Sequence, residues 1–189
     1  NGENSSYSIV MALPDVDRIF LHHPGTNDTF TSSDIDYTAV EKCSLFHFGY
    51  PTLMRKMYLD EGAELTQMFK KVKSLGLTTS LDMTLPDPSS ESGKVNWKNI
   101  LERTLPYVDI FLPSIEEVTY MIDTDLFEKC KKISGSKDPV WGYKPDDFNY
   151  ISDKLLEMGT KITAIKAGIR GYYLRTADKQ TLADAGKIE

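Results

Sequence analysis

Hydrophobic residues fall in short runs that polar, glycine-rich or proline-rich segments separate. Two runs rich in β-branched and aromatic residues, 7–13 and 18–23, flank a Pro/Asp turn at 14–17, which predicts a pair of antiparallel strands. Residues 24–30 combine Pro, Gly, Asn and Asp, so we expect a loop there. Residues 32–43 begin with capping side chains and predict a short helix.

From residue 44 onward, strand-like runs alternate with amphipathic segments. Between residues 59 and 75 one helical face is clear, because apolar side chains recur at helical spacing: Leu65, Met68, Phe69, Val72 and Leu75. Gly76 then supplies a helix stop. The other strands are predicted at 44–50, 77–84, 109–113, 161–168 and 171–178, and the other helices at the start of 96–108, at 114–122 and 146–159, and weakly at 179–186.

This order of elements, β, α, β, α, β, α, α, β from Ser44 onward, predicts an α/β fold. Short hydrophobic strands alternating with amphipathic helices are typical of a mostly parallel sheet covered by helices on both faces. Such sheets bind ligands outside the carboxyl ends of their strands. We therefore expect functional side chains where the predicted strands end.

Polar or glycine residues occupy four of those ends: Gly49–Pro51, Asp82–Asp87, Pro113–Glu117 and Lys166–Gly171. Each cluster by itself is explained more simply by turn chemistry, since glycine supplies positive φ and aspartate caps loops. At 134–145 a Gly/Pro-rich stretch predicts a further loop. Only a combination of the four clusters would favour a site.

Ser114 and Glu117 illustrate the two interpretations. Their spacing matches a capping box, in which the serine hydroxyl and the glutamate carboxylate each accept a backbone N–H. A helix start at the carboxyl edge of a sheet also favours anions, and a carboxylate there could hold Mg²⁺ and its waters beside a phosphate. The two roles are compatible.

Composition excludes several classes of protein. The 189 residues are 40% hydrophobic and 26% charged, which suits one globular domain or most of one. A net charge of −6 and the lack of a basic stretch argue against nucleic acid or an anionic membrane as a partner. Cys43 and Cys130 form no CxxC, so we expect neither a zinc site nor a disulfide framework, and we expect a reduced, cytoplasmic setting. No apolar run is long enough to cross a membrane, and the start does not resemble a signal peptide.

Five fragments, in order, resemble the central portion of the PfkB (ribokinase-like) carbohydrate kinases. They are RIFLHHPGTNDTF, LFHFGYP, GLTTSLDMTLPD, VDIFLPSIEEV and ITAIKAGIRGYYLRT. The resemblance implies a three-layer α/β/α sandwich with a small antiparallel lid pair, here incomplete, in a partial kinase domain spanning 1–189. The lid and sugar-side strands would occupy 1–30, and the α/β core with part of the nucleotide site 44–189.

The family transfers the γ-phosphoryl group of ATP to a sugar or nucleoside hydroxyl with Mg²⁺, which implies roles for residues of this chain. Glu117 matches the carboxylate that organises Mg²⁺. The cofactor-binding residues would be Ser114, Lys166, Gly168 and Gly171, and the sugar-side residues Gly25, Thr26, Asn27 and Asp82. Ser114 and Thr84 each occupy a position where the family usually has asparagine.

The resemblance also implies two motifs that the 189 residues do not contain. A Gly-Gly segment that seats the sugar is expected before Asn1, and a Gly-Ala-Gly-Asp motif with the catalytic base and an anion hole is expected after Glu189. Because base and anion hole are each worth a factor of about 10² or more in rate, we expect this chain to be inactive alone, whereas its full-length parent is a kinase. The lid strands predict a homodimer surface, as lids of this family often pair between subunits.

Other functions fit the same residues. One alternative is a nucleoside or phosphosugar kinase of this fold, for which Arg55, Lys56 and Arg170 are the candidate cations. Another is a non-catalytic ligand-binding relative, which the Ser114 and Thr84 departures favour.

Overall fold

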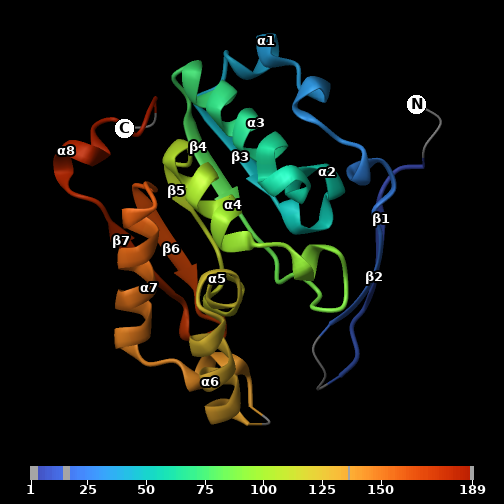
Figure 1. The fold of residues 1–189 in the computed structure, drawn as a ribbon, viewed down its shortest axis with the longest axis vertical. Helices are drawn as coiled ribbons and strands as arrows, with labels where there is room; N and C mark the ends of the chain where they lie inside the picture. Colours follow the sequence, from blue (N-terminus) through green and yellow to red (C-terminus); the bar gives the residue numbers. More distant parts are fainter. Residues whose placement is uncertain (1–3, 15–17, 136, 188–189) are drawn as a thin grey trace.

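A computed structural model describes residues 4–14, 18–135 and 137–187 (Figure 1). The strands are β1 (Tyr7–Met11), β2 (Ile19–His23), β3 (Leu45–Gly49), β4 (Thr78–Asp82), β5 (Ile110–Phe111), β6 (Ile162–Lys166) and β7 (Tyr172–Thr176). The α-helices are α1 (Tyr37–Val40), α2 (Arg55–Tyr58), α3 (Ala63–Ser74), α4 (Trp97–Thr104), α5 (Ile115–Ile122), α6 (Thr124–Ser134), α7 (Pro145–Glu157) and α8 (Lys179–Leu182). Short 3-10 turns connect several of them.

Five strands form the main sheet, in the order β3-β4-β5-β6-β7. The first four are parallel, and β7 returns antiparallel to β6 after the glycine turn. Sequence order and spatial order coincide, because each parallel neighbour is reached through a crossover that carries at least one helix. The predicted mostly parallel α/β fold with a separate antiparallel pair is confirmed.

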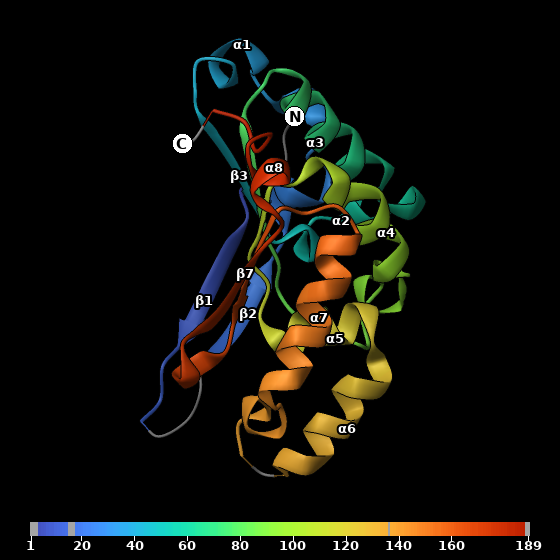
Figure 2. The same ribbon diagram turned by 90° about the vertical axis from the view of Figure 1, so that its left-hand side faces the viewer.

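The core lies between this sheet and the helices α3, α4, α5 and α7, which Figure 2 shows on the same side of the sheet. Phe46 and Phe48 of β3 both meet the ring of Phe69 in α3 edge-on, with ring centres 5.9 and 6.4 Å apart. The other face of the sheet is more open, since Tyr172 and Leu174 of β7 are 78% and 62% exposed. In the described residues the sheet therefore has one densely packed face.

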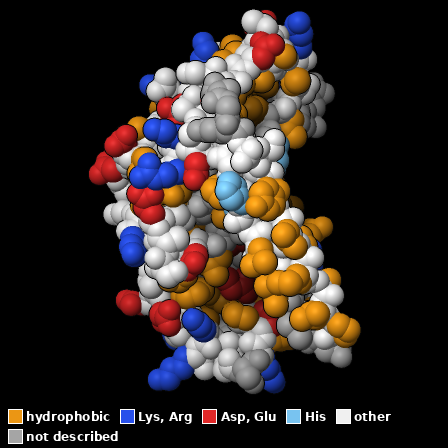
Figure 3. All heavy atoms as spheres, turned by 90° about the vertical axis from the view of Figure 1, so that its right-hand side faces the viewer, with side chains coloured by type: hydrophobic (Ala, Val, Ile, Leu, Met, Phe, Trp, Pro, Cys, Tyr) orange, Lys and Arg blue, Asp and Glu red, His pale blue; other side chains and the backbone are white. Residues whose placement is uncertain are grey.

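The β1–β2 pair is the predicted antiparallel hairpin, with Ile9 opposite Leu21. Its turn was predicted at 14–17, of which residues 15–17 lie outside the described residues. Every residue of both strands is exposed. Figure 3 shows the resulting hydrophobic surface along the hairpin, beside a hollow at whose bottom acidic side chains lie. An exposed patch of this kind is typical of an interaction surface.

Several element boundaries differ from the sequence pattern. The helix predicted over 32–43 is divided into a 3-10 turn, Ser32–Asp34, and the short α1. The helix predicted within 59–75 begins only at Ala63, because Asp60, Glu61 and Gly62 have positive φ angles that interrupt α-helical geometry. Helix α6 was not predicted. Residues 24–30, expected as a loop, include a 3-10 turn at Gly25–Asp28.

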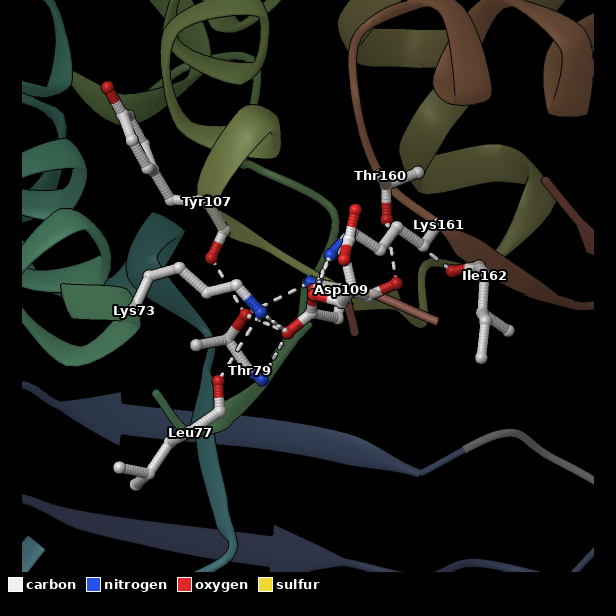
Figure 4. A network of polar contacts seen from close by, with 9 residues as sticks. Lys73, Leu77, Thr79, Tyr107, Asp109, Thr160, Lys161 and Ile162 are labelled. Carbon is white, nitrogen blue, oxygen red and sulfur yellow. Dashed lines mark hydrogen bonds and ion pairs between the residues drawn. The ribbon is translucent and has the colours of Figure 1, made fainter. Parts of the chain in front are cut away.

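A buried aspartate joins three strands near their amino ends (Figure 4). The Asp109 side chain is 1% exposed and lies between the ammonium groups of Lys73, at 2.5 Å, and Lys161, at 2.9 Å. One of its oxygens also accepts the backbone N–H of Thr79 at 2.9 Å. Because every donor comes from a different part of the chain, this network fixes how α3, β4 and β6 meet.

Candidate functional site

Three neighbouring parallel strands bring the predicted residues to one edge. Strand β4 ends at Asp82, and β6 ends at Lys166. Strand β5 lies between these two strands in the sheet. After β5 the chain enters helix α5, whose N-cap residue Ser114 forms a parallel bridge with Lys166. The Lys166 N–H donates to the carbonyl oxygen of Pro113 at 2.8 Å. The carboxyl ends of β4, β5 and β6 therefore form a continuous rim, as the parallel topology predicts.

Lys166 is the charged centre of this rim. Its ammonium nitrogen lies 2.6 Å from Oδ1 of Asp82 and 3.9 Å from Oε2 of Glu117. Oδ1 of Asp82 also accepts the backbone N–H of Met83 at 2.8 Å. Because 40% of the Lys166 side chain is exposed, its ammonium group remains accessible to a ligand at the rim.

Glu117 closes the predicted capping box, which is confirmed. Its carboxylate accepts the Ser114 N–H at 2.6 Å, and its own N–H donates to the Ser114 hydroxyl at 3.1 Å. Burial raises the pKa of Glu117 to about 7, despite the opposing effects of the Ser114 N–H and of Lys166. A largely buried carboxylate whose pKa lies near neutrality is typical of functional sites.

The glycine turn after β6 lies beside this cluster. Gly168 and Gly171 have φ angles of +52° and +86°, which other residues adopt at a cost. The turn is closed by hydrogen bonds from the Ala167 N–H to Gly171 O and from the Gly171 N–H to Gly168 O, at 2.7 and 3.1 Å. No atom lies within 4 Å of the position that a Cβ of Gly171 would take, among the described residues. The backbone is therefore open to a ligand at that point.

Two acidic side chains next to the turn were not singled out from the sequence. A Cβ on Gly168 would lie 3.8 Å from Oδ2 of Asp138. Burial raises the pKa of Glu116, and the charge of Asp138 raises it further. Asp138 belongs to the Gly/Pro-rich loop, and its only local signal is a capping position before Pro139, where it accepts the Val140 N–H at 3.0 Å. Asp138 and Glu116 therefore add two carboxylates near the glycine turn, besides Asp82 and Glu117 near Lys166.

The two arginines considered for a phosphosugar are already engaged. Arg55 forms a two-pronged ion pair with Glu91, with nitrogen–oxygen distances of 2.8 and 3.0 Å. Arg170 donates to the carbonyl oxygens of Val140 and Tyr143 at 3.1 and 2.8 Å and thereby ties the glycine turn to the loop before α7. Arg55 therefore uses two of its nitrogens on Glu91, whereas Arg170 is held through Nη1 alone.

Gly25, Thr26 and Asn27 lie apart from this cluster, in the 3-10 turn that follows the hairpin. The Thr26 N–H donates to Asn4 O at 3.0 Å, and a Cβ on Gly25 would lie only 2.4 Å from that oxygen. Thr26 and Asn27 line an open pocket of about 440 Å³. Within the described residues, no hydrogen bond or ion pair joins Gly25 or Asn27 to Asp82, Glu117 or Lys166.

The described ranges contain neither a cluster of metal ligands nor a helix that could span a membrane. No three His, Cys, Asp or Glu side chains there are grouped to hold a metal ion, so a cation at Glu117 would need ligands from a substrate or water. His22, His23 and His47 are engaged instead with Ser8, with the Gly25 N–H and with Ser80. None of the described helices has the length and apolarity to cross a bilayer.

Comparison with known proteins gives one sequence relative and many structural ones. No protein-family model matches the chain. An uncharacterized sugar kinase of Archaeoglobus fulgidus is 23% identical over 163 residues, which are 86% of this chain and 52% of that protein. The chain thus spans about half the length of the curated relative that it matches.

Solved structures share the fold. The ribokinase of Arabidopsis thaliana, in complex with ribose and ATP, matches with a TM-score of 0.59 at 18% identity, over 93% of this chain and 46% of its own. A PfkB protein from Polaromonas sp. JS666 matches with a TM-score of 0.60 at 15% identity, over 91% and 51%. At these identities the matches establish the fold alone. Any function must be argued from the residues of the rim.

Proposed function

We propose that the chain is part of a PfkB (ribokinase-like) carbohydrate kinase, as its motifs predict, and that the full-length protein phosphorylates a sugar hydroxyl with ATP. One observation carries this proposal: Asp82, Glu117 and Lys166, which are distant in sequence, meet at the carboxyl ends of adjacent parallel strands. Their order along the chain is that of the family's motifs. The sugar-kinase relative supports the same reaction class.

Glu117 is the proposed site for Mg²⁺. The donor set fits, because Mg²⁺ commonly takes one or two protein carboxylates and completes its shell with water and phosphate oxygens. When bound, the ion would neutralise charge on the phosphate groups of ATP. Ser114 holds the Glu117 carboxylate in a fixed orientation through the capping box, which limits the movement of the ligand oxygen. Ser114 therefore acts on the ion through Glu117.

Lys166 and the glycine turn are the proposed phosphate contacts. With a net charge of −6 the chain as a whole repels a nucleotide tail, so a local cation is required. The ammonium group of Lys166 offers that charge, and the absence of side chains at Gly168 and Gly171 lets phosphate oxygens approach the backbone. The Arabidopsis ribokinase holds ATP in its complex, which supports this assignment.

Asp82, Gly25 and Asn27 are proposed on the sugar side. The Asp82 carboxylate, 2.6 Å from the ammonium group of Lys166, can accept hydrogen bonds from sugar hydroxyls. We place the lid and sugar-side strands in 1–30 and the α/β core in 44–189, so Gly25 and Asn27 would approach the sugar from the lid. The catalytic base is proposed outside residues 1–189, and turnover by these residues alone is expected to be negligible.

The test compares the full-length protein with residues 1–189 in an assay that couples ADP release to a panel of sugars. Full-length protein should release ADP with at least one sugar, and the 189-residue chain should not. Glu117→Gln in the full-length protein should abolish Mg²⁺-dependent turnover, with Glu102→Gln on the exposed face of α4 as a control of equal charge change. Sugar binding without ADP release would favour a ligand-binding protein, and rapid turnover by the short chain would overturn the placement of the base.

We also propose that the hairpin joins two copies. Apolar side chains along it are about half exposed, with Ile9 at 54%, Phe20 at 55% and Leu21 at 54%. Pairing two such hairpins through the face that carries Val10 and Phe20 would remove these two side chains from water, which is favourable by roughly 25 cal/mol per Å². Sedimentation of full-length protein should give a dimer that Phe20→Lys converts to a monomer, and a monomeric wild type would disprove the pairing.

A further inference from the structure

The segment Gly49–Pro51 is the one predicted strand-end cluster that the proposed function does not use. Within it, Tyr50 has φ and ψ angles of +65° and +53°, in the left-handed region. That conformation is costly for a bulky side chain and free of strain only for glycine. A tyrosine at such a position, where glycine would be free of strain, indicates that its ring has a function there.

The surrounding contacts hold this conformation in place. The Tyr50 N–H donates to the carbonyl oxygen of Asp82 at 3.3 Å, and the Tyr50 carbonyl accepts the Leu53 N–H at 2.9 Å. Pro51 and Thr52, the next two residues, are buried. The backbone is therefore fixed on both sides of Tyr50, which fixes the position from which its side chain leaves the rim.

The ring itself has no internal partner. Tyr50 is 46% exposed, and within the described part of the chain its hydroxyl makes no hydrogen bond and its ring no stacking contact. The other exposed phenols of the sheet region, such as Tyr7, are stacked or lie on strands. An exposed aromatic ring with no internal partner is available for stacking on a ligand.

Its position connects it to the proposed sugar site. Gly49 is the register partner of Asp82, so Tyr50 follows directly at the rim beside that carboxylate. A Cβ on Gly49 would lie 3.7 Å from Nε2 of His47 and 3.9 Å from Cβ of Asp82, so Gly49 itself packs next to both side chains. The rim at β3 thus carries an exposed tyrosine one residue beyond the register partner of Asp82.

We propose that Tyr50 is a specificity-determining residue that stacks on the apolar face of a cyclic sugar whose hydroxyl groups Asp82 accepts. A sugar ring presents C–H groups on its face and hydroxyls at its edge, which matches a phenol ring next to a carboxylate. This inference rests on the proposed function, because it names the class of acceptor, a ring-closed sugar. Stacking of this kind contributes about a fivefold to tenfold change in affinity.

The test uses full-length Tyr50→Asn and Tyr50→Phe. Asparagine tolerates the left-handed region and removes the ring, so folding is preserved while stacking is lost. Asp60→Asn is the matched control, because Asp60 also has positive φ, at +49°. Dissociation constants for D-ribose and D-fructose are measured by calorimetry without nucleotide, and the KM for ATP is measured separately.

We expect Tyr50→Asn to weaken binding of the preferred sugar about tenfold, with the KM for ATP unchanged and with wild-type affinity in Tyr50→Phe and Asp60→Asn. Equal sugar affinity in wild type and Tyr50→Asn would overturn the role of Tyr50 and leave the kinase proposal intact. Sugar binding without phosphorylation would overturn the kinase proposal alone, since the affinities still decide the role of Tyr50. Failure of both sugars to bind the wild type would overturn this inference.

Discussion

The ammonium group of Lys166 lies 2.6 Å from the carboxylate of Asp82, although 84 residues separate them along the chain. The pair spans the sheet from β6 to β4, across the end of β5. Glu117 belongs to α5, the helix that follows β5, and its carboxylate lies 3.9 Å from the same nitrogen. One cation therefore balances two carboxylates that would otherwise repel each other at the rim.

Removing this cation should change how Glu117 titrates. Because Lys166 holds the pKa of Glu117 down, Lys166→Met should raise that pKa further above about 7. In this proposal, binding of ATP with Mg²⁺ requires the ionised carboxylate. The pH below which ATP binding is lost should therefore be higher in the variant. The measurement is affinity by calorimetry on full-length protein between about pH 6 and 9.

Lys166→Arg is the matched control, since it keeps the charge and should keep the wild-type pH profile. A uniform loss of affinity at every pH in Lys166→Met would show that Lys166 acts on phosphate only and does not tune Glu117.

The raised pKa of Glu117 also predicts a pH-dependent stability. Folded protein keeps the Glu117 proton up to about pH 7, whereas the unfolded chain loses it near 4.5. Between these values the folded state binds more protons, so the free energy of unfolding falls as pH rises. Glu117→Gln removes this loss and should be more stable than wild type at about pH 8, by an amount on the order of 3 kcal/mol.

Urea unfolding of both proteins at acidic and at alkaline pH measures the difference. Near pH 4 the two proteins should have similar stability, because the carboxyl group is protonated in both states. An equal difference at both pH values would mean that the pKa of Glu117 is the same in the folded and the unfolded protein.

Asp109 should matter for stability more than any surface charge. Asp109→Asn leaves Lys73 and Lys161 without their shared anion, and breaking a buried pair costs about 3 to 5 kcal/mol. Since both lysines keep some exposure, we expect about 3 kcal/mol in the free energy of unfolding. Glu102→Gln, at an exposed pair 3.8 Å from Lys98, should change it by less than about 0.5 kcal/mol. Comparable effects at the two positions would contradict a structural role for the Asp109 network.

Ser152→Ala should stabilise the protein. The Ser152 hydroxyl is buried inside α7 and has no hydrogen-bond partner in the described structure. Alanine removes that unsatisfied group and has the higher helix propensity, so melting experiments should show a gain of about 1 kcal/mol. Ser134 in α6 donates to Lys131 O at 2.9 Å, and Ser134→Ala should give no such gain. A loss of stability in Ser152→Ala would mean that its hydroxyl has a partner, such as a buried water.

Local features were predictable from the sequence because neighbouring residues carry them. Periodicity located the long helices, and the Ser114–Glu117 spacing located a capping box that the structure confirms. Helix α6 escaped prediction because its buried stripe is narrow, limited to Phe127, Cys130 and Ser134, and because Asp123 both ends α5 and caps α6. Weak local signals of this kind become helical only through packing.

The sequence by itself determined a parallel α/β sheet and the residues at its strand ends. Only the tertiary structure decided which ends adjoin, and hence that Lys166 reaches Asp82 across the end of β5. The left-handed backbone of Tyr50 and the raised pKa of Glu117 also came from the fold. The physical reason is that periodicity and capping act over a few residues, whereas strand order, burial and desolvation depend on contacts between distant segments.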